Sequence, residues 1–310
     1  MKGFTHFITG LAVASCLPPA VREAAAGNPI PMVAGGLFGL LPDALDFKIV
    51  RFFARHDIEI VPDPLAPDMP MVAEAVAWAA GQARRTGRPV RLRLAPIRLG
   101  ADAWQSYTVR FDPAGAVRAG LGPVQTTGGR PLAEAPAAAA EVQAPVRFVI
   151  GYEARVAVTI LDGPLLALAP QPDGRVRVEF IPWHRAWSHS LLLAGGAGLV
   201  TGFLAGGTVG WVAALAWAAH SLVDQAGFLG AALLYPVSRT RFPGLQLARS
   251  NNAWANLALV WMAGLLLFWN LARFGLPPVP INGFRLFLLG GLLPLGLLAR
   301  FMRRPPHEPA

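Results

Sequence analysis

Histidine and aspartate residues stand out in this sequence because they lie inside or beside long apolar runs. Ionisable groups are costly in apolar surroundings and are usually paired or functional there. Imidazole nitrogens and carboxylate oxygens suit Zn²⁺ first, and also Mn²⁺ or Fe²⁺. We therefore expect a divalent metal site, which could render a bound water a hydrolytic nucleophile. Its candidate ligands come from four distant segments and are His6, Asp43, His184, His189, His220 and Asp224, with Asp46 close by.

Spacing within two of these segments supports a shared site. Asp43 and Asp46 are three residues apart, and His220 and Asp224 are four apart. Side chains at these separations are neighbours on one face of a helix. Each pair could therefore reach a single ion.

His184 and His189 are five residues apart, a separation that aligns poorly on a continuous helix. We therefore expect His184 in a loop and His189 in the first turn of a helix. Ser188 would cap that helix, since serine is a favoured N-cap residue. The only cysteine is Cys16, which excludes an intrachain disulfide and a thiolate-rich zinc site.

Taken singly, these residues also have ordinary structural interpretations. His6 could be an interfacial residue at a helix end, and Asp43 could form a turn after Pro42. Asp224 could pair with an arginine such as Arg239. The case for a metal depends on the segments acting together.

The amino-acid composition indicates whether water or lipid surrounds the helices that carry these side chains. Hydrophobic residues make up 54% of the 310 residues and charged residues only 15%, which is too apolar for an ordinary soluble domain. Hydropathy divides the chain into an apolar start, a mixed middle over 57–180 and an apolar remainder. The middle holds 13 arginines against 13 acidic residues, so the net charge of +9 belongs to the apolar parts. This balance argues against nucleic-acid binding.

The apolar parts predict about six transmembrane helices. The expected spans are Phe4–Pro18, Pro29–Leu41, two helices from Ser190–Ala219 broken at Gly206 and Gly207, Asn252–Ala272, and Phe284–Met302. The predicted fold class is a mainly α, polytopic membrane protein with an inserted soluble α+β or mostly β module. The expected domains are a first helical hairpin over 1–56, the insert over 57–180, a second hairpin over 181–236, and two C-terminal helices over 237–310.

The sequence of the insert predicts one helix and several short strands. The helix is expected over Met71–Arg85, and a flexible loop over Gly128–Pro145. The expected strands are Val90–Leu94, Ser106–Phe111, Val146–Ile150, Arg155–Leu161 and Arg175–Phe180. Such a module could recruit a cytosolic protein.

Alternation of six helices would place both termini, the insert and most basic residues on one face. The positive-inside rule then puts that face in the cytoplasm. The N-terminus has a competing interpretation, because Val13-Ala14-Ser15-Cys16 after an apolar run resembles a lipoprotein signal whose cleavage would remove His6.

The ordered motifs resemble a known family. They are Thr5-His6, then Leu41-Pro42-Asp43-Ala44-Leu45-Asp46, then His184-Arg185-Ala186-Trp187-Ser188-His189-Ser190, then His220-Ser221-Leu222-Val223-Asp224. This series is similar to the membrane-bound metal-dependent hydrolases, also described as LexA-binding, inner-membrane-associated hydrolases. The family pattern is Leu-Pro-Asp-x-Asp, so Asp46 stands one residue late, and Ser188 replaces a threonine. The match covers about 1–47 and 183–236.

The resemblance implies hydrolysis by a metal-activated water. In that scheme Asp224 or Asp46 handles the proton and Arg185 steadies a developing oxyanion. A looser similarity to zinc-dependent phospholipase C indicates a phosphoester, presented as a lipid from the bilayer. Two alternatives stay open: a metal or proton transporter, and a membrane scaffold or regulatory protein with a structural metal.

Overall fold

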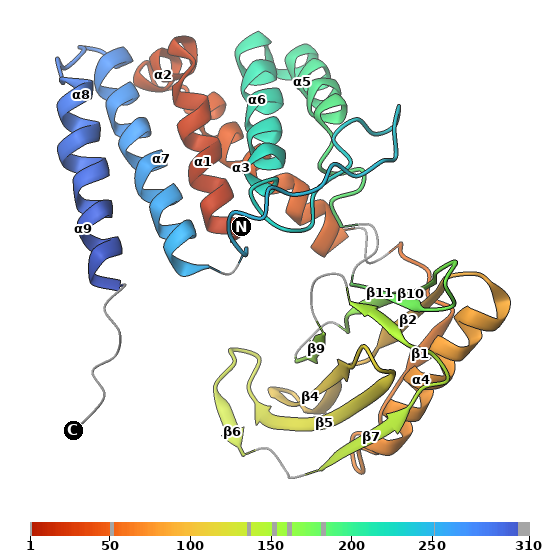
Figure 1. Cartoon of the computed structure of the whole chain (residues 1–310). Coiled ribbons are helices and arrows are strands. Elements are labelled where there is room, and N and C mark those ends of the chain that lie inside the picture. Colours follow the sequence, from red (N-terminus) through yellow and green to blue (C-terminus); the bar gives the residue numbers. More distant parts are fainter. Residues whose placement is uncertain are drawn as a thin grey trace, which may run out of the picture. The chain divides into compact units, whose positions relative to one another are not determined.

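The computed structural model describes residues 2–49, 53–134, 138–150, 154–159, 163–180, 184–250 and 252–302. The chain divides into two compact units (Figure 1). The first unit joins Met1–Phe52 to Trp183–Ala310, and the second is the intervening Phe53–Pro182. The first unit is helical and the second contains the β-sheets.

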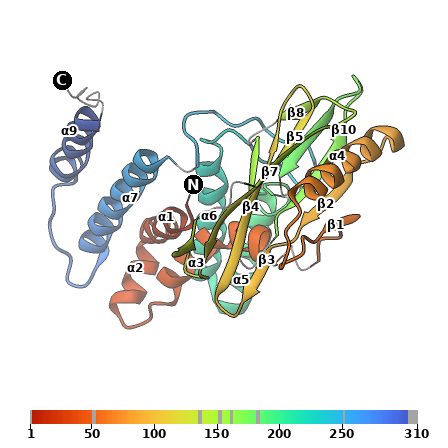
Figure 2. The same cartoon turned by 90° about the horizontal axis from the view of Figure 1, so that it is seen from below.

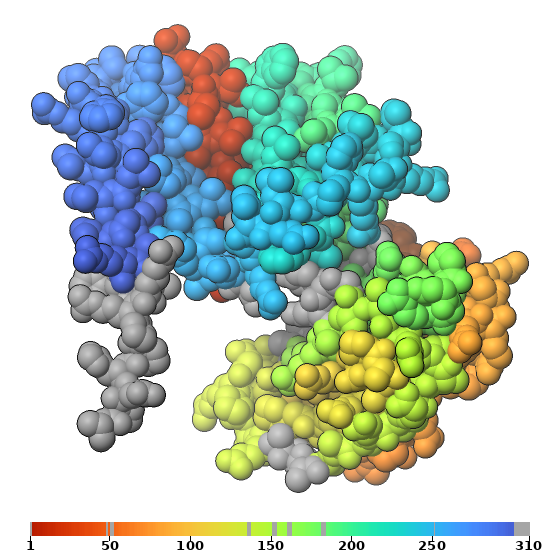
Figure 3. All heavy atoms as spheres, in the orientation of Figure 1, coloured from red at the N-terminus to blue at the C-terminus, as the bar shows by residue number. Residues whose placement is uncertain are grey.

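The first unit consists of helices that come from both ends of the chain. Its elements are α1 Gly3–Ser15, α2 Pro18–Ala25, α3 Ile30–Ala44, the π-helical turn η1 Leu45–Ile49, α5 Leu191–Ala205, α6 Gly207–Asp224, α7 Ala253–Phe274, α8 Gly283–Arg285, the π-helical η3 Leu286–Leu292, and α9 Leu293–Met302. The predicted break in the Ser190–Ala219 run is confirmed, since α5 ends before Gly206 and α6 begins after it. Figure 3 shows α7 packed beside α1.

The predicted mainly α fold of about six transmembrane helices is wrong. Among the described residues, three helical segments are long and apolar enough to cross a membrane: Ile30–Phe47, Ala253–Phe274 and Gly283–Arg300. The α1–α2 pair would add a fourth only as a span bent by 93°. The α5 helix has 15 residues, and α6 ends in polar side chains. The apolar composition therefore led to an overestimate of the number of helices that cross a membrane.

The sidedness expected from the sequence loses its basis with this correction. Placing both termini and the insert in the cytoplasm depended on six helices alternating in direction. The three segments that could span a membrane do not supply that alternation. What stands is that part of the chain is apolar and long enough to lie in a bilayer.

Glycines bring α1 and α3 into backbone contact. A Cβ on Gly35 would lie 2.5 Å from the Ala14 Cβ and 2.6 Å from the Gly10 carbonyl oxygen. A Cβ on Gly39 would lie 2.6 Å from the His6 carbonyl oxygen. Small residues of this kind let apolar helices approach closely where no water drives them together. The crossing places His6 of α1 beside the end of α3.

Polar side chains fasten α7 to α1 at two levels. The Thr5 hydroxyl donates to Asn256 Oδ1 at 2.8 Å near the start of α1. The Asn270 amide donates to Ser15 Oγ at 3.1 Å near its end. Both asparagines are buried, and a hydrogen bond between helices satisfies each of them. The helix that carries His6 is thus held on two sides.

The second unit contains two β-sheets and one long helix, α4 Met69–Thr86 (Figure 2). One sheet has the order β1-β2-β10-β11-β8, and the other has β3-β4-β5-β6 with β7 on β5 and β9 on β4. Their strands are β1 Ile58–Ile60, β2 Val90–Leu94, β3 Ile97–Gly100, β4 Ala103–Phe111, β5 Ala116–Gln125, β6 Pro131–Ala133, β7 Ala139–Gln143, β8 Phe148–Ile150, β9 Arg155–Val158, β10 Leu165–Pro170 and β11 Val176–Phe180. Alanine-rich α4 packs against both sheets in one core.

Several predicted elements of this unit are confirmed and one is corrected. The strand over Val90–Leu94 and the helix over Met71–Arg85 match β2 and α4 within two residues. The run Gly128–Pro145, expected as a flexible loop, contains β6 and β7 instead. Strand β7 pairs with β5, so the backbone ladder outweighs the low strand propensity of its alanines. With two sheets present, the chain combines α and β structure.

The α1–α3 contact predicts a specific sensitivity to one methyl group. We expect Gly35→Ala to lower the free energy of unfolding by about 1–3 kcal/mol, because the added Cβ overpacks the crossing. A thermal melt in detergent would show this as a lower midpoint. The matched control is Gly196→Ala on α5, where a Cβ meets nothing within 4 Å. That variant should be as stable as wild type or slightly more so, and equal melting of the two variants would contradict the prediction.

Candidate metal centre

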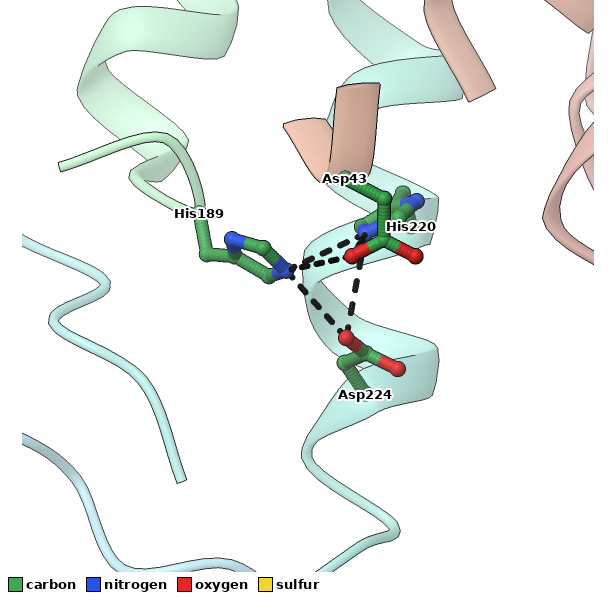
Figure 4. A group of neighbouring side chains, drawn as sticks. All are labelled: Asp43, His189, His220 and Asp224. Carbon is green, nitrogen blue, oxygen red and sulfur yellow. Dashed lines mark hydrogen bonds and ion pairs between the residues drawn. The ribbon is translucent and has the colours of Figure 1, made fainter. Parts of the chain in front are cut away.

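Four side chains from three separate segments meet inside the first unit (Figure 4). Asp43 lies near the end of α3, His189 lies in the segment before α5, and His220 and Asp224 lie in the last turns of α6. One ligand atom from each falls within 4.8 Å of all the others. The group could hold a metal ion.

The separations between these atoms suit a shared ion. His189 Nε2 lies 3.1 Å from His220 Nε2 and 3.2 Å from Asp224 Oδ2. Asp43 Oδ1 lies 3.7 Å from the Nε2 atom of each histidine. Two ligands of a tetrahedral zinc ion, each about 2.1 Å from it, are about 3.4 Å apart. The observed values fall on both sides of that separation.

Hydrogen bonds on the outer side of each ring set which nitrogens face inward. His220 Nδ1 lies 2.6 Å from the Gly39 carbonyl oxygen, which can only accept, so this nitrogen carries the proton. His189 Nδ1 lies 2.9 Å from Ser188 Oγ and 3.5 Å from Asp46 Oδ2. The proton on His220 Nδ1 leaves the Nε2 lone pair of that ring directed into the cluster, and the same tautomer of His189 would direct its Nε2 lone pair there as well. Partners of this kind orient metal-binding histidines.

The segment that carries His189 is held by α5 and α6. Ser190, rather than the expected Ser188, is the N-cap of α5 and accepts from the amides of Leu192 and Leu193. His189 therefore precedes the helix and does not lie in its first turn. Trp217, one turn before His220, donates its Nε1 proton to the Ser188 carbonyl oxygen at 2.6 Å. This bond ties the segment to α6.

Asp46 lies behind the histidines, in the π-helical turn η1 that follows α3. Its Oδ2 accepts from the Arg185 amide at 3.0 Å and lies 2.9 Å from His184 Nδ1. Asp46, His184 and His189 form a second group that could hold an ion. His184 does not belong to the first group. A π-helical turn takes up one additional residue, which matches the late position of the second aspartate in the sequence motif.

The Arg185 guanidinium contacts both the side chain and the backbone carbonyl of Asp224. Its Nη2 lies 3.0 Å from Asp224 Oδ2, and its Nη1 donates to the Asp224 carbonyl oxygen at 3.0 Å. The residue is buried and has a positive φ of 57°. Asp224 thus pairs with Arg185, where the sequence pointed to Arg239 as one option. Arg185 braces a candidate ligand.

His6 projects from α1 toward the two carboxylates. Its Nε2 lies 3.2 Å from Asp224 Oδ1 and 4.0 Å from Asp43 Oδ2. The side chain is fully buried; its Nε2 faces the Asp224 carboxylate, and its Nδ1 makes no hydrogen bond to the part of the chain that the structure describes. A buried imidazole in this condition fits a site whose remaining partner is a cation. The donor set therefore suits a divalent metal.

The exposed fractions of the side chains show which side of the cluster is open to solvent. The Asp43 side chain is 16% exposed, whereas those of His6, His189, His220 and Asp224 are 0–1% exposed. Burial lowers the pKa of His189 to about 4. The imidazole is consequently neutral at physiological pH, which is the form that binds metal. Asp43 marks the side from which a substrate or water could enter.

Two residues of the site carried no usable signal in the sequence. Gly39 contributes only its carbonyl oxygen, and its small size is read first as a packing feature. From the sequence, Trp217 would be assigned to lipid contact. In the structure its Nε1 donates a hydrogen bond to the Ser188 carbonyl oxygen. Its position three residues before His220, on the same helix face, was the available clue.

Comparison with known proteins identifies no relative. No protein-family model matches the sequence. No curated protein and no solved structure matches it either. The site is therefore interpreted from its own geometry.

We expect the purified protein to contain stoichiometric zinc or a related divalent metal, and His189→Ala and His220→Ala to lose it. Each substitution removes an inward-facing Nε2 lone pair from the first group. Elemental analysis of detergent-purified protein measures this directly. The control is His56→Ala, which removes a histidine that pairs with Glu59 in the other unit. A folded wild type that binds no metal on addition would refute the site.

The low pKa of His189 predicts a pH-dependent stability of the metal-free protein. Protonation favours the unfolded chain, where the pKa is near 6.5, over the folded chain, where it is about 4. The free energy of unfolding should therefore fall as pH drops from about 6.5 to 4, by at most roughly 3 kcal/mol. Denaturant titrations at several pH values would measure the slope. The slope should be smaller in metal-free His189→Gln, and an identical slope would exclude His189 as its source.

Proposed function

We propose that this protein is a membrane-associated, metal-dependent hydrolase that acts on a phosphoester, in particular one carried by a lipid. The observation that carries the proposal is the convergence of two imidazoles and two carboxylates in one small volume. Zinc is the ion proposed first, since the donor set is nitrogen and oxygen without thiolate. Manganese or iron would suit the same donors.

A bound divalent ion polarises the bond to be cleaved and lowers the pKa of water. The chain's own residues supply the remaining requirements. Asp43, the most exposed carboxylate of the first group, would hold the ion at the open side, where water and substrate could reach it. Asp224 is held by Arg185, and Asp46 holds His184 and the backbone of Arg185. Asp46 and Arg185 are thus proposed as positioning residues.

The resemblance to membrane-bound metal-dependent hydrolases supports the same proposal. The residues that carry it, His6, Asp43, His189, His220 and Asp224, are distant in sequence and adjacent in space. A set of unrelated polar residues has no reason to converge in this way. Membrane association is supported by the three helical segments long enough to span a bilayer.

A lipid-linked substrate is favoured by where the cluster lies. It forms at the ends of apolar helices, with His189 just before α5 and Asp224 at the end of α6. Both helices expose large apolar side chains, among them Leu199, Phe203 and Trp211. A substrate with its polar group at the cluster could keep its apolar part in the bilayer. Bacterial inner-membrane residence, expected from the family, is part of the proposal.

Hydrolysis should be measurable on metal-loaded protein in mixed micelles. We expect release of headgroup or phosphate from a phosphodiester lipid, with weaker turnover of soluble bis(p-nitrophenyl) phosphate. The rate should fall by at least about 100-fold in His220→Ala and in Asp43→Asn, since each removes a ligand or proton-transfer group. His56→Ala should match wild type. Metal-loaded, folded protein that releases nothing from either substrate would leave a structural metal in a scaffold as the better explanation.

A further inference from the structure

The two carboxylates of the cluster each present their oxygens to different histidines. Asp43 Oδ1 lies 3.7 Å from the Nε2 atoms of His189 and His220, whereas Asp43 Oδ2 lies 4.0 Å from His6 Nε2. Asp224 repeats the pattern, with Oδ2 3.2 Å from His189 Nε2 and Oδ1 3.2 Å from His6 Nε2. Each carboxylate therefore has one oxygen directed to each side.

A single ion held by Asp43, His189, His220 and Asp224 would not account for the position of His6. His6 is fully buried, and its Nδ1 has no hydrogen-bond partner in the described part of the chain. A buried polar group left unsatisfied is destabilising. Its Nε2 is directed at the second oxygen of each carboxylate. These three donor atoms could serve a second ion.

The spacing of the two halves matches a pair of ions. The rings of His6 and His220 are stacked, with centroids 3.8 Å apart and planes inclined by 29°. Ions in two-metal hydrolytic sites are about 3.5–4 Å apart. One ion bound to each stacked ring would lie at a comparable separation. Both aspartates are oriented to bridge them.

We propose that the centre is dinuclear, with a second divalent ion bound by His6 Nε2, Asp43 Oδ2 and Asp224 Oδ1. The first ion is held by His189, His220 and the other oxygens of the same aspartates. This inference depends on the proposed metal centre and extends it. It assigns His6 as a ligand of its own ion and Asp43 and Asp224 as bridges.

Charge gives the second ion a functional role. The cluster and its neighbours contain three carboxylates, Asp43, Asp46 and Asp224, and one guanidinium, Arg185. One divalent ion would neutralise their formal charge, whereas two leave an excess of two positive charges. That excess suits an anionic phosphoester, and paired ions stabilise the attacking and leaving oxygens of an in-line displacement.

The test counts metals and measures their coupling. Wild type, His6→Ala, His6→Gln and the control His56→Ala are purified in detergent, equilibrated with Mn²⁺, and examined by elemental analysis and electron paramagnetic resonance. We expect two ions and an exchange-coupled spectrum in wild type and His56→Ala. Both His6 variants should hold one ion with an uncoupled spectrum.

The two His6 variants keep the result interpretable, because His6→Gln preserves volume and their melting curves report folding. One ion in wild type, unchanged by either substitution, would overturn the dinuclear centre and leave the single-ion hydrolase intact. A second ion lost in His184→Ala but retained in the His6 variants would also overturn it, since that ion would lie at Asp46. Absence of metal from folded wild type would overturn both proposals.

Discussion

The close approach of buried imidazoles and carboxylates is the constraint on which the rest of this structure depends. His189 Nε2 and His220 Nε2 approach to 3.1 Å, with carboxylate oxygens at 3.2–3.7 Å. Buried groups this close must share either a proton or a cation. Hydrogen bonds to the Gly39 carbonyl and the Ser188 hydroxyl hold the two rings in place, and the cluster could hold a metal ion. The packing of the first unit can be understood from the requirement to bring these side chains together.

The helices meet this requirement through three different contacts. Glycines allow α1 to approach α3, so that His6 reaches Asp224. The Trp217 side chain fixes the segment before α5, so that His189 reaches the same place. Arg185 binds the end of α6 through Asp224. No contact of this set involves the second unit, which forms a core of its own.

The residues that meet in the cluster could be predicted from the sequence because helical spacing and apolar surroundings are local properties. His220 and Asp224 share a face at a separation of four residues, and the polar residues of the other segments stood out against their neighbours. The roles were less accessible. Asp46 looked like a ligand or proton carrier, yet its position depends on a π-helical turn and on Arg185 and His184, which no spacing rule relates. Ser190 caps α5 because its hydroxyl accepts from the helix amides, whereas the Ser188 hydroxyl lies 2.9 Å from His189 Nδ1.

The number of membrane crossings could not be predicted because hydropathy counts apolar residues. It does not show whether a helix is long enough to cross a bilayer or packs against another helix. The Ser190–Ala219 run is apolar throughout, but it folds as helices of 15 and 18 residues packed against each other. The Gly128–Pro145 run looked structureless because its alanines and prolines have low strand propensity. Pairing of β7 with β5 depends on a partner strand that local composition does not reveal.

The Gly39 carbonyl connects metal affinity to helix packing. This oxygen holds the Nδ1 proton of His220, and the same residue touches the His6 backbone. A main-chain acceptor has no side chain to exchange, so the tautomer of His220 depends on where α3 lies along α1 and α6. An ion bound at the cluster would make thermodynamic linkage work in both directions: the ion would tighten the three-helix contact, and a change in a surrounding bilayer that shifts α3 would alter the affinity for the ion. Ion occupancy would then depend on the thickness of that bilayer.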